Sequence, residues 1–164
     1  TPISGSINFD GVAKTDTNNL GSATAFTSIS GVTVVPVETG NYVGTTGAAA
    51  TFTPFSFSAS SVTPLWTFMV AGVTYSFDAV GPITIVTQNN NFLNIQGSGW
   101  ATETGFDATP GTWSITDTAQ GKITTFTFGA SSTVPDSGAT ALLIALGLAG
   151  VAVGMVAQRK LAKA

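Results

Sequence analysis

The stretch LWTFMVAGVTYSFDAV, residues 65–80, decides the fold, because two runs of alternating apolar residues flank a short turn. Large apolar side chains occupy every second position on both sides of that turn: Trp66, Phe68, Val70, Val73, Tyr75 and Phe77. Successive side chains of a strand point to opposite faces, so each run gathers its large side chains on one face. Ala71-Gly72 predicts a tight turn between the runs. The stretch therefore predicts an antiparallel hairpin with one buried face.

The same alternation recurs through the first 133 residues. Ile3, Ile7 and Phe9 mark the first candidate strand, which Asp10-Gly11 is expected to end. The other candidates are residues 23–29, 32–37, 50–57, 65–70, 73–80, 83–87, 92–97, 111–116 and 123–130. Helical spacing is absent before residue 137. About ten short strands predict one antiparallel β-sandwich or jelly-roll-like ectodomain over residues 1–133.

Three glycine-rich or asparagine-rich stretches are interpreted locally. Asn89-Asn90-Asn91 predicts a hairpin, because asparagine tolerates positive φ, and Pro110-Gly111 fits a type II turn. Gly97-Ser98-Gly99 begins a GxGxxG pattern, but Thr102 stands at the third glycine position and no helix follows. A bulge or strand end is the better interpretation there.

Composition excludes several function classes. Charged residues make up 8% of the chain, and five Lys and Arg against eight Asp and Glu give a net charge of −3. A sparsely charged acidic surface repels phosphate backbones, so we expect no nucleic-acid partner. The chain contains no histidine and no cysteine. This excludes catalytic triads and metal sites built on either residue, and we expect no catalytic, metal or cofactor site.

The few candidates for chemistry have simpler interpretations. Glu103 and Asp107 are the nearest pair of carboxylates in sequence, but they fall in a turn region and are expected to be solvated. Asp16-x-Asn18-Asn19 is similar to the start of a calcium loop but lacks the glycine and the final glutamate of an EF-hand, which favours a surface turn.

Aromatic residues leave one alternative function open. A carbohydrate-binding module would need an exposed aromatic platform. Trp66 and Trp113 share faces with apolar neighbours and are expected in the core, whereas Trp100 and Tyr42 remain candidates for such a platform.

Residues 134–164 form a separate tail. Residues 139–157 carry no charge over 19 positions, a helix length of about 28 Å, close to the hydrocarbon core of a bilayer. We expect one helix from about Ser137 to about Lys160. Small residues at helical spacing predict a packing ridge: Ala141, Ala145, Ala149, Gly150 and Gly154. The basic end, Arg159, Lys160 and Lys163, predicts a type I topology with residues 1–133 facing outward.

The pentapeptide Val134, Pro135, Asp136, Ser137 and Gly138, followed by the apolar run and the basic end, resembles the tail of PEP-CTERM proteins in its VPDSG variant. Weaker similarity covers roughly residues 60–130. The resemblance implies recognition and cleavage by an exosortase, a membrane transpeptidase, and delivery to the cell surface or extracellular matrix of a Gram-negative bacterium. The alternative is an ordinary single-pass anchor without a sorting role.

Together these features predict a secreted, non-enzymatic structural protein of the bacterial surface or matrix. The chain begins at Thr1 rather than Met, as though a signal peptide had been removed, while the tail is retained. A retained apolar helix must be buried, so copies are expected to assemble into a fibre or oligomer through packed helices, with at least a transient inner-membrane stage. The alternative is a carbohydrate-binding module that tethers cells to polysaccharide.

Overall fold

The computed structural model describes residues 1–118 and 124–130. The chain divides into two compact units, Thr1–Ser132 and Thr133–Ala164, and all described residues belong to the first. The expected C-terminal helix therefore lies outside the described residues. Among those residues, none of the helices has the length and apolar character needed to span a bilayer.

The described part of the chain is built from strands. Two short 3-10 helices, η1 (Leu20–Ser22) and η2 (Gly40–Tyr42), are its only helical turns. The strands are β1 (Gly5–Thr15), β2 (Ala25–Val35), β3 (Thr51–Phe52), β4 (Phe55–Ser56), β5 (Ser61–Val70), β6 (Val73–Val80), β7 (Thr84–Asn89), β8 (Phe92–Glu103), β9 (Thr109–Thr118) and β10 (Thr124–Ala130). The predicted all-β class and the number of about ten strands are confirmed.

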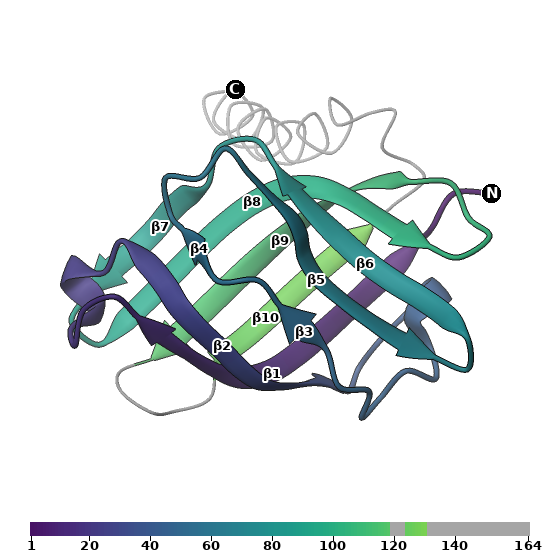
Figure 1. The fold of residues 1–164 in the computed structure, drawn as a ribbon, viewed down its shortest axis with the longest axis horizontal. Coiled ribbons are helices and arrows are strands. Elements are labelled where there is room, and N and C mark those ends of the chain that lie inside the picture. Colours follow the sequence, from purple (N-terminus) through teal and green to yellow (C-terminus); the bar gives the residue numbers. More distant parts are fainter. Residues whose placement is uncertain (119–123, 131–164) are drawn as a thin grey trace, which may run out of the picture. The chain divides into compact units, whose positions relative to one another are not determined.

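All of these strands belong to one curled antiparallel sheet (Figure 1). Their order is β3-β5-β6-β8-β9-β10-β1-β2-β4, and β7 pairs with the part of β8 that β6 leaves unpaired. The edge strands β3 and β4 are separated by only two residues, Thr53 and Pro54. The segment of residues 51–56 therefore joins the two edges of the sheet, pairing with β5 at one end and with β2 at the other.

Two of the predicted turns are confirmed. Ala71 and Gly72 connect β5 to β6 with φ of 51° and 80°, the left-handed backbone that a two-residue hairpin requires. Asn89 pairs with Phe92 across the β7–β8 hairpin, and its side-chain oxygen accepts a hydrogen bond from the Asn91 amide at 2.9 Å. The polar turn residues thus connect neighbouring strands of the sheet.

Two other local predictions are wrong. Pro110-Gly111 lies inside β9, paired with Trp100 and Gly99 of β8, instead of forming a turn. Asp10-Gly11 does not end the first strand, because β1 continues to Thr15 past a register shift between Asp10 and Val12. In both cases pairing with neighbouring strands outweighs the local tendency to turn.

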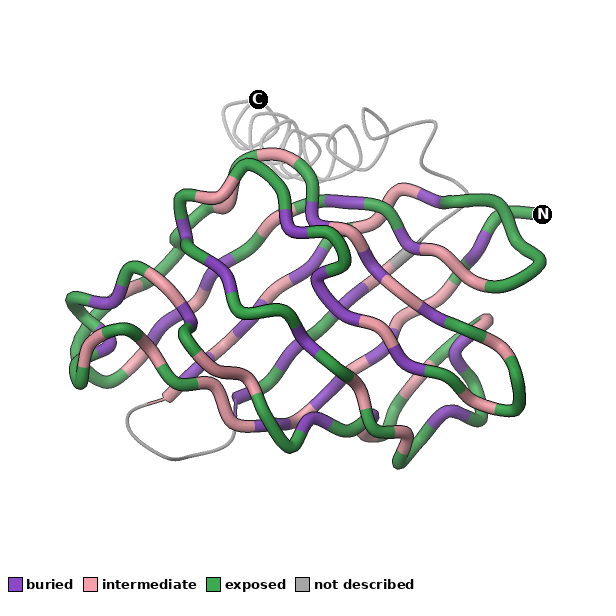
Figure 2. Tube along the Cα trace, in the orientation of Figure 1, coloured by how far each residue is buried: buried purple, intermediate pink, exposed green. Residues whose placement is uncertain are grey.

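The inward face of the sheet holds an aromatic core. Buried residues alternate with exposed ones along most strands, as the sequence pattern requires (Figure 2). Phe9 of β1 lies at the centre, with ring centroids 5.0 Å from Trp66 and 5.8 Å from Phe128. Because β1 and β5 are not neighbours in the sheet, these contacts join opposite parts of the curled sheet across the core.

Gly97 and Gly99 let β8 run straight through this core. A Cβ on Gly97 would lie 2.6 Å from the Trp113 ring, and a Cβ on Gly99 would lie 1.9 Å from the Asp78 carbonyl oxygen. The predicted bulge or strand end at residues 97–99 is therefore wrong. The ladder to β9 continues without a shift, and the glycines accommodate close packing.

Candidate functional site

The outward face of β8, β9, β10 and β1 carries short hydroxyl and amide side chains in register. Strand pairing aligns one row across four strands: Ser98, Thr112, Gly129 and Ser6. It aligns a second row next to the first: Thr84, Gln96, Ser114, Thr127 and Asn8. Neighbouring strands lie about 4.7–4.9 Å apart, so the four-strand row extends over about 14 Å.

These rows border an open groove of about 600 Å³, which we call the hydroxyl groove. Its lining contains no charged residue. Gly129 forms part of its floor, and a Cβ built on Gly129 would meet no atom within 4 Å. The hydroxyls of Thr112 and Thr127 have no hydrogen-bond partner within the described part of the chain. The groove thus offers polar groups that the fold itself leaves unused.

Trp100 lies on the same face of β8, two positions beyond Ser98 of the groove. Its side chain is 44% exposed, whereas Trp66 and Trp113 are 0% and 3% exposed, which confirms that the latter two belong to the core. Strand pairing places Trp100 between Asp78 of β6 and Pro110 of β9. Trp100 therefore remains a candidate platform for a ligand.

The prediction that Tyr42 could form such a platform is wrong. Its side chain is only 1% exposed and its ring packs 5.8 Å from that of Tyr75. Burial, with a smaller contribution from the negative charge of Glu103, raises the pKa of Tyr42 far above its ordinary value. The 3-10 helix η2 turns this residue inward. The sequence of this loop has no periodicity, so it could not indicate that the Tyr42 side chain points into the core.

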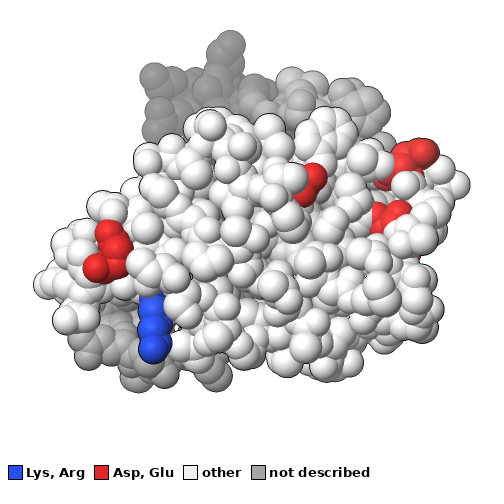
Figure 3. All heavy atoms as spheres, viewed as in Figure 1, with Lys and Arg blue, Asp and Glu red and all other residues white. Residues whose placement is uncertain are grey.

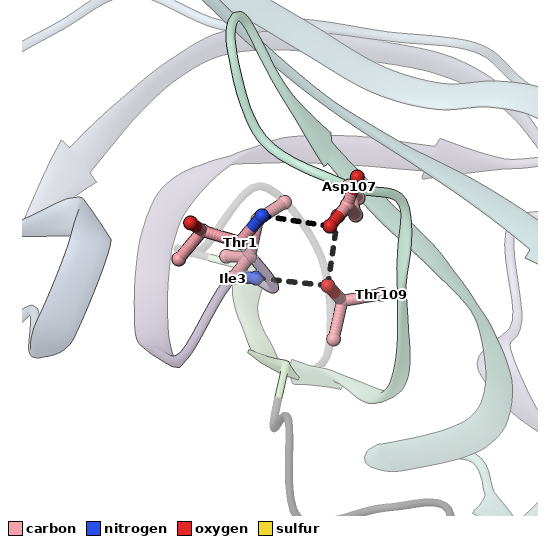
Figure 4. A network of polar contacts seen from close by, with 4 residues as sticks. All are labelled: Thr1, Ile3, Asp107 and Thr109. Atoms are coloured by element: carbon pink, nitrogen blue, oxygen red, sulfur yellow. Dashed lines mark hydrogen bonds and ion pairs between the residues drawn. The ribbon is translucent and has the colours of Figure 1, made fainter.

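Glu103 and Asp107 have separate partners. Glu103 accepts a hydrogen bond from the Asn41 side chain at 2.8 Å. Asp107 lies 2.7 Å from the N-terminal ammonium of Thr1, and Thr109 donates to the Asp107 carbonyl while accepting from the Ile3 amide (Figure 4). Each carboxylate thus anchors a different segment of the chain.

Asp16 closes the loop between β1 and β2. Its carboxylate accepts hydrogen bonds from the Thr24 amide at 2.9 Å, from the Thr24 hydroxyl and from the Ala25 amide. These bonds, first of all that from the Thr24 hydroxyl, hold the pKa of Asp16 below its ordinary value of 3.8. Asp16 thus acts in the surface turn that the sequence favours, and the described residues contain no group of three or more potential metal ligands among Asp, Glu, His and Cys.

Asp117 is the buried carboxylate of β9. Its Oδ1 accepts a hydrogen bond from the Thr124 hydroxyl at 3.0 Å, and Thr124 in turn accepts from the Ala13 amide. Burial raises the pKa of Asp117 above its ordinary value, and this effect outweighs the opposing hydrogen bonds. The arrangement joins β9, β10 and β1.

Asp78 differs from these carboxylates. It is half-buried beside Trp100, and within the described part of the chain it alone among the acidic side chains accepts no hydrogen bond. Partial burial raises the pKa of Asp78. The face seen in Figure 3 is mostly uncharged, with a few scattered acidic groups and a basic one. Asp78 thus combines two features: it pairs with an exposed tryptophan, and it accepts no hydrogen bond from the described residues.

The sites predicted in the tail lie outside the described residues. They are the pentapeptide Val134 to Gly138, the small residues Ala141, Ala145, Ala149, Gly150 and Gly154, and the basic residues Arg159, Lys160 and Lys163. Comparisons with protein-family models, with curated proteins and with solved structures find no match for the chain.

Sequence reasoning missed the hydroxyl groove. Its signal is present, because Thr112 and Ser114 alternate with Trp113 and Ile115 in β9. Alternation shows which side chains face outward, but it does not show which strands are neighbours or how they are aligned. The groove depends on that register and could not be recognised without it.

Proposed function

We propose that this chain is a secreted, non-enzymatic structural protein of the cell surface or extracellular matrix of a Gram-negative bacterium. The observation that carries the proposal is the use of the carboxylates. Six of the seven in the described residues accept hydrogen bonds from the fold's own loops, strands or N-terminus. Side chains engaged in this way hold a scaffold together and are poorly placed for acid and base catalysis.

The core and the surface support the same function. A cysteine-free chain must be stabilised by packing alone, and the closely packed aromatic side chains around Phe9 supply such packing. Hydroxyl and amide groups, rather than charges, give the outward face its polarity. Such a domain suits display outside the cell, where a polar surface of low charge faces other matrix components.

In this proposal the tail contains the sorting signal. An exosortase recognises the pentapeptide, the apolar run and the basic end during export, and in copies that keep the tail it acts as an assembly element. Helices from neighbouring copies pack through the ridge that includes Gly150 and Gly154, because glycine lets helix backbones approach closely. Copies then form a fibre or oligomer with the β-domains displayed outside.

Intact mass and negative-stain microscopy of the native protein test both parts of the proposal. Full-length mass together with polymers is the expected result. Gly150→Leu and Gly154→Leu should abolish the polymers and leave the β-domain folded, whereas Ala152→Leu, on another face of the expected helix, should leave them intact. A full-length chain that stays monomeric without lipid or detergent would overturn the assembly.

The sorting and the lack of activity have separate tests. Deletion of residues 134–138 should trap the chain in the inner membrane of a host that carries an exosortase, while the intact chain reaches the surface. Glycan, ester or peptide hydrolysis by the pure protein, lost in Glu103→Gln or Asp107→Asn, would show that the protein is an enzyme.

A further inference from the structure

We propose that the outward face of β8, β9 and β10 binds a neutral polysaccharide, with one sugar ring stacked on Trp100 and the adjoining chain in the hydroxyl groove. The proposal goes beyond a structural function and does not depend on the tail. Three independent features support it: the groove, the exposed indole of Trp100, and the neighbouring carboxylate of Asp78 on β6, which accepts no hydrogen bond from the described residues.

The groove has the size and polarity for part of a sugar chain. Its volume of about 600 Å³ lies in the range of small-molecule sites, about 300–1,000 Å³, and it is open along the surface. Gly97, Trp113, Phe128 and Gly129 are also part of the lining and contribute apolar atoms. Serine and threonine hydroxyls stand around this lining, and each can donate and accept hydrogen bonds, as sugar hydroxyls do.

Trp100 adds an apolar platform at the end of the groove. A tryptophan ring that is 44% exposed leaves a large apolar surface in water, although the same chain buries its other two tryptophans almost completely. The C–H face of a pyranose ring covers such a surface while its hydroxyls stay at the edge. Asp78, directly opposite Trp100 across the strands, can accept hydrogen bonds from those hydroxyls.

Other classes of ligand fit this face less well. Nucleic acids and anionic glycans require cationic groups, and the groove lining has none. A peptide that adds a strand needs a free sheet edge, but β8, β9 and β10 are each paired on both sides. Uncharged hydroxyls around an apolar surface are complementary to an uncharged polyol. A neutral polysaccharide is therefore the occupant that this face favours.

Tryptophan fluorescence of the full-length chain provides the assay, because Trp100 is the exposed member of the three tryptophans. Titration with cellohexaose, laminarihexaose, maltohexaose, mannohexaose and xylohexaose should shift the emission and protect it from iodide quenching for at least one sugar. Affinity electrophoresis in gels containing the matching polysaccharides measures binding to the polymer. Alginate serves as the anionic polymer, which should not retard the protein.

Variants separate the parts of the site. Trp100→Ala should weaken binding at least about tenfold, equivalent to about 1.4 kcal/mol, and Trp100→Phe should restore part of it. Gly129→Val should fill the groove and weaken binding, while the protein stays folded, because its Cβ enters open space. Phe106→Ala removes another exposed aromatic ring, 38% exposed, from a turn outside the groove and serves as the matched control.

The outcomes decide the proposal in both directions. Binding of a neutral sugar that is lost in Trp100→Ala and Gly129→Val but retained in Phe106→Ala supports it. Absence of binding to every sugar and polymer of the panel would overturn it, as would equal binding by wild type and Trp100→Ala. Retardation by alginate alone would show that charge, rather than this groove, governs recognition.

Discussion

Replacing Phe52 with alanine should open the place where the two edges of the sheet meet. The strand β3 has only two residues, so few backbone hydrogen bonds attach it to β5. The Phe52 ring is buried, with its centroid 4.5 Å from that of Phe126, 5.2 Å from Phe9 and 6.0 Å from Phe128. The ring therefore anchors β3 to the core.

The expected loss of stability follows from these contacts. Burial of a phenylalanine side chain contributes about 1.5–3 kcal/mol, and a favourable aromatic pair adds about 0.5–1.5 kcal/mol beyond it. Phe-to-Ala substitutions in cores cost about 3–5 kcal/mol, because they also leave a cavity. We expect Phe52→Ala to lower the free energy of unfolding by about 4 kcal/mol. Since the free energy of unfolding of small domains is only about 5–15 kcal/mol, the variant should be folded but only marginally stable.

Urea denaturation followed by tryptophan fluorescence measures this loss, and hydrogen exchange over residues 50–57 localises it. Thr53→Ala is the matched control in the same segment. It removes only the hydrogen bond from the Thr53 hydroxyl to the Pro64 carbonyl, for an expected loss of about 0.5–1.5 kcal/mol. A loss below about 1.5 kcal/mol for Phe52→Ala, or unchanged exchange over residues 50–57, would refute the role of Phe52 in closing the sheet.

Four further substitutions test the packing around two glycines and the environments of two carboxylates. Gly99→Ala should cost about 1–3 kcal/mol in urea denaturation, because its Cβ would collide with the Asp78 carbonyl, whereas Gly129→Ala should be neutral or slightly stabilising. Asp117→Asn should raise the melting temperature at pH 7 and not at pH 3. Because the pKa of Asp117 is raised in the native state, that state favours the protonated carboxyl, and it loses stability as the pH rises above about 3.8. Asp16→Asn should have the opposite effect, a lower melting temperature at pH 7 and little change at pH 2. Because the pKa of Asp16 is lowered in the native state, its ionised carboxylate stabilises that state above pH 3.8, and this contribution disappears as the pH falls. Equal effects of either substitution at both pH values would contradict the assigned environment.

The sequence predicted those parts of the fold that depend on neighbours in the chain. Alternation placed Trp66 and Trp113 in the core, and the turn residues located the hairpins at residues 71–72 and 89–91. Both signals act within a few residues, so they survive in any arrangement of the strands. The closure of the sheet through residues 51–56 joins strands far apart in sequence, and no local pattern carries that information.

The wrong local predictions share a physical reason. Gly99 and Gly111 favour turns when they are considered alone, but in the structure they face each other across β8 and β9. A Cβ on Gly111 would lie 2.4 Å from the Gly129 carbonyl oxygen, so glycine is needed there for close approach and not for bending. Composition alone cannot distinguish these two uses of glycine.

A hydroxyl-rich outward face does not by itself indicate a ligand, because a chain with 8% charged residues needs hydroxyls for solubility. Trp100 and Asp78 have no such explanation. An exposed indole lowers solubility, and partial burial disfavours the charged form of the Asp78 carboxylate, which accepts no hydrogen bond from the described residues. The two residues that carry these costs, Asp78 of β6 and Trp100 of β8, lie directly opposite each other, next to the groove. A ligand that covers the indole and donates to the carboxylate would remove both costs at once, and for that reason we place the proposed binding site at this end of the groove.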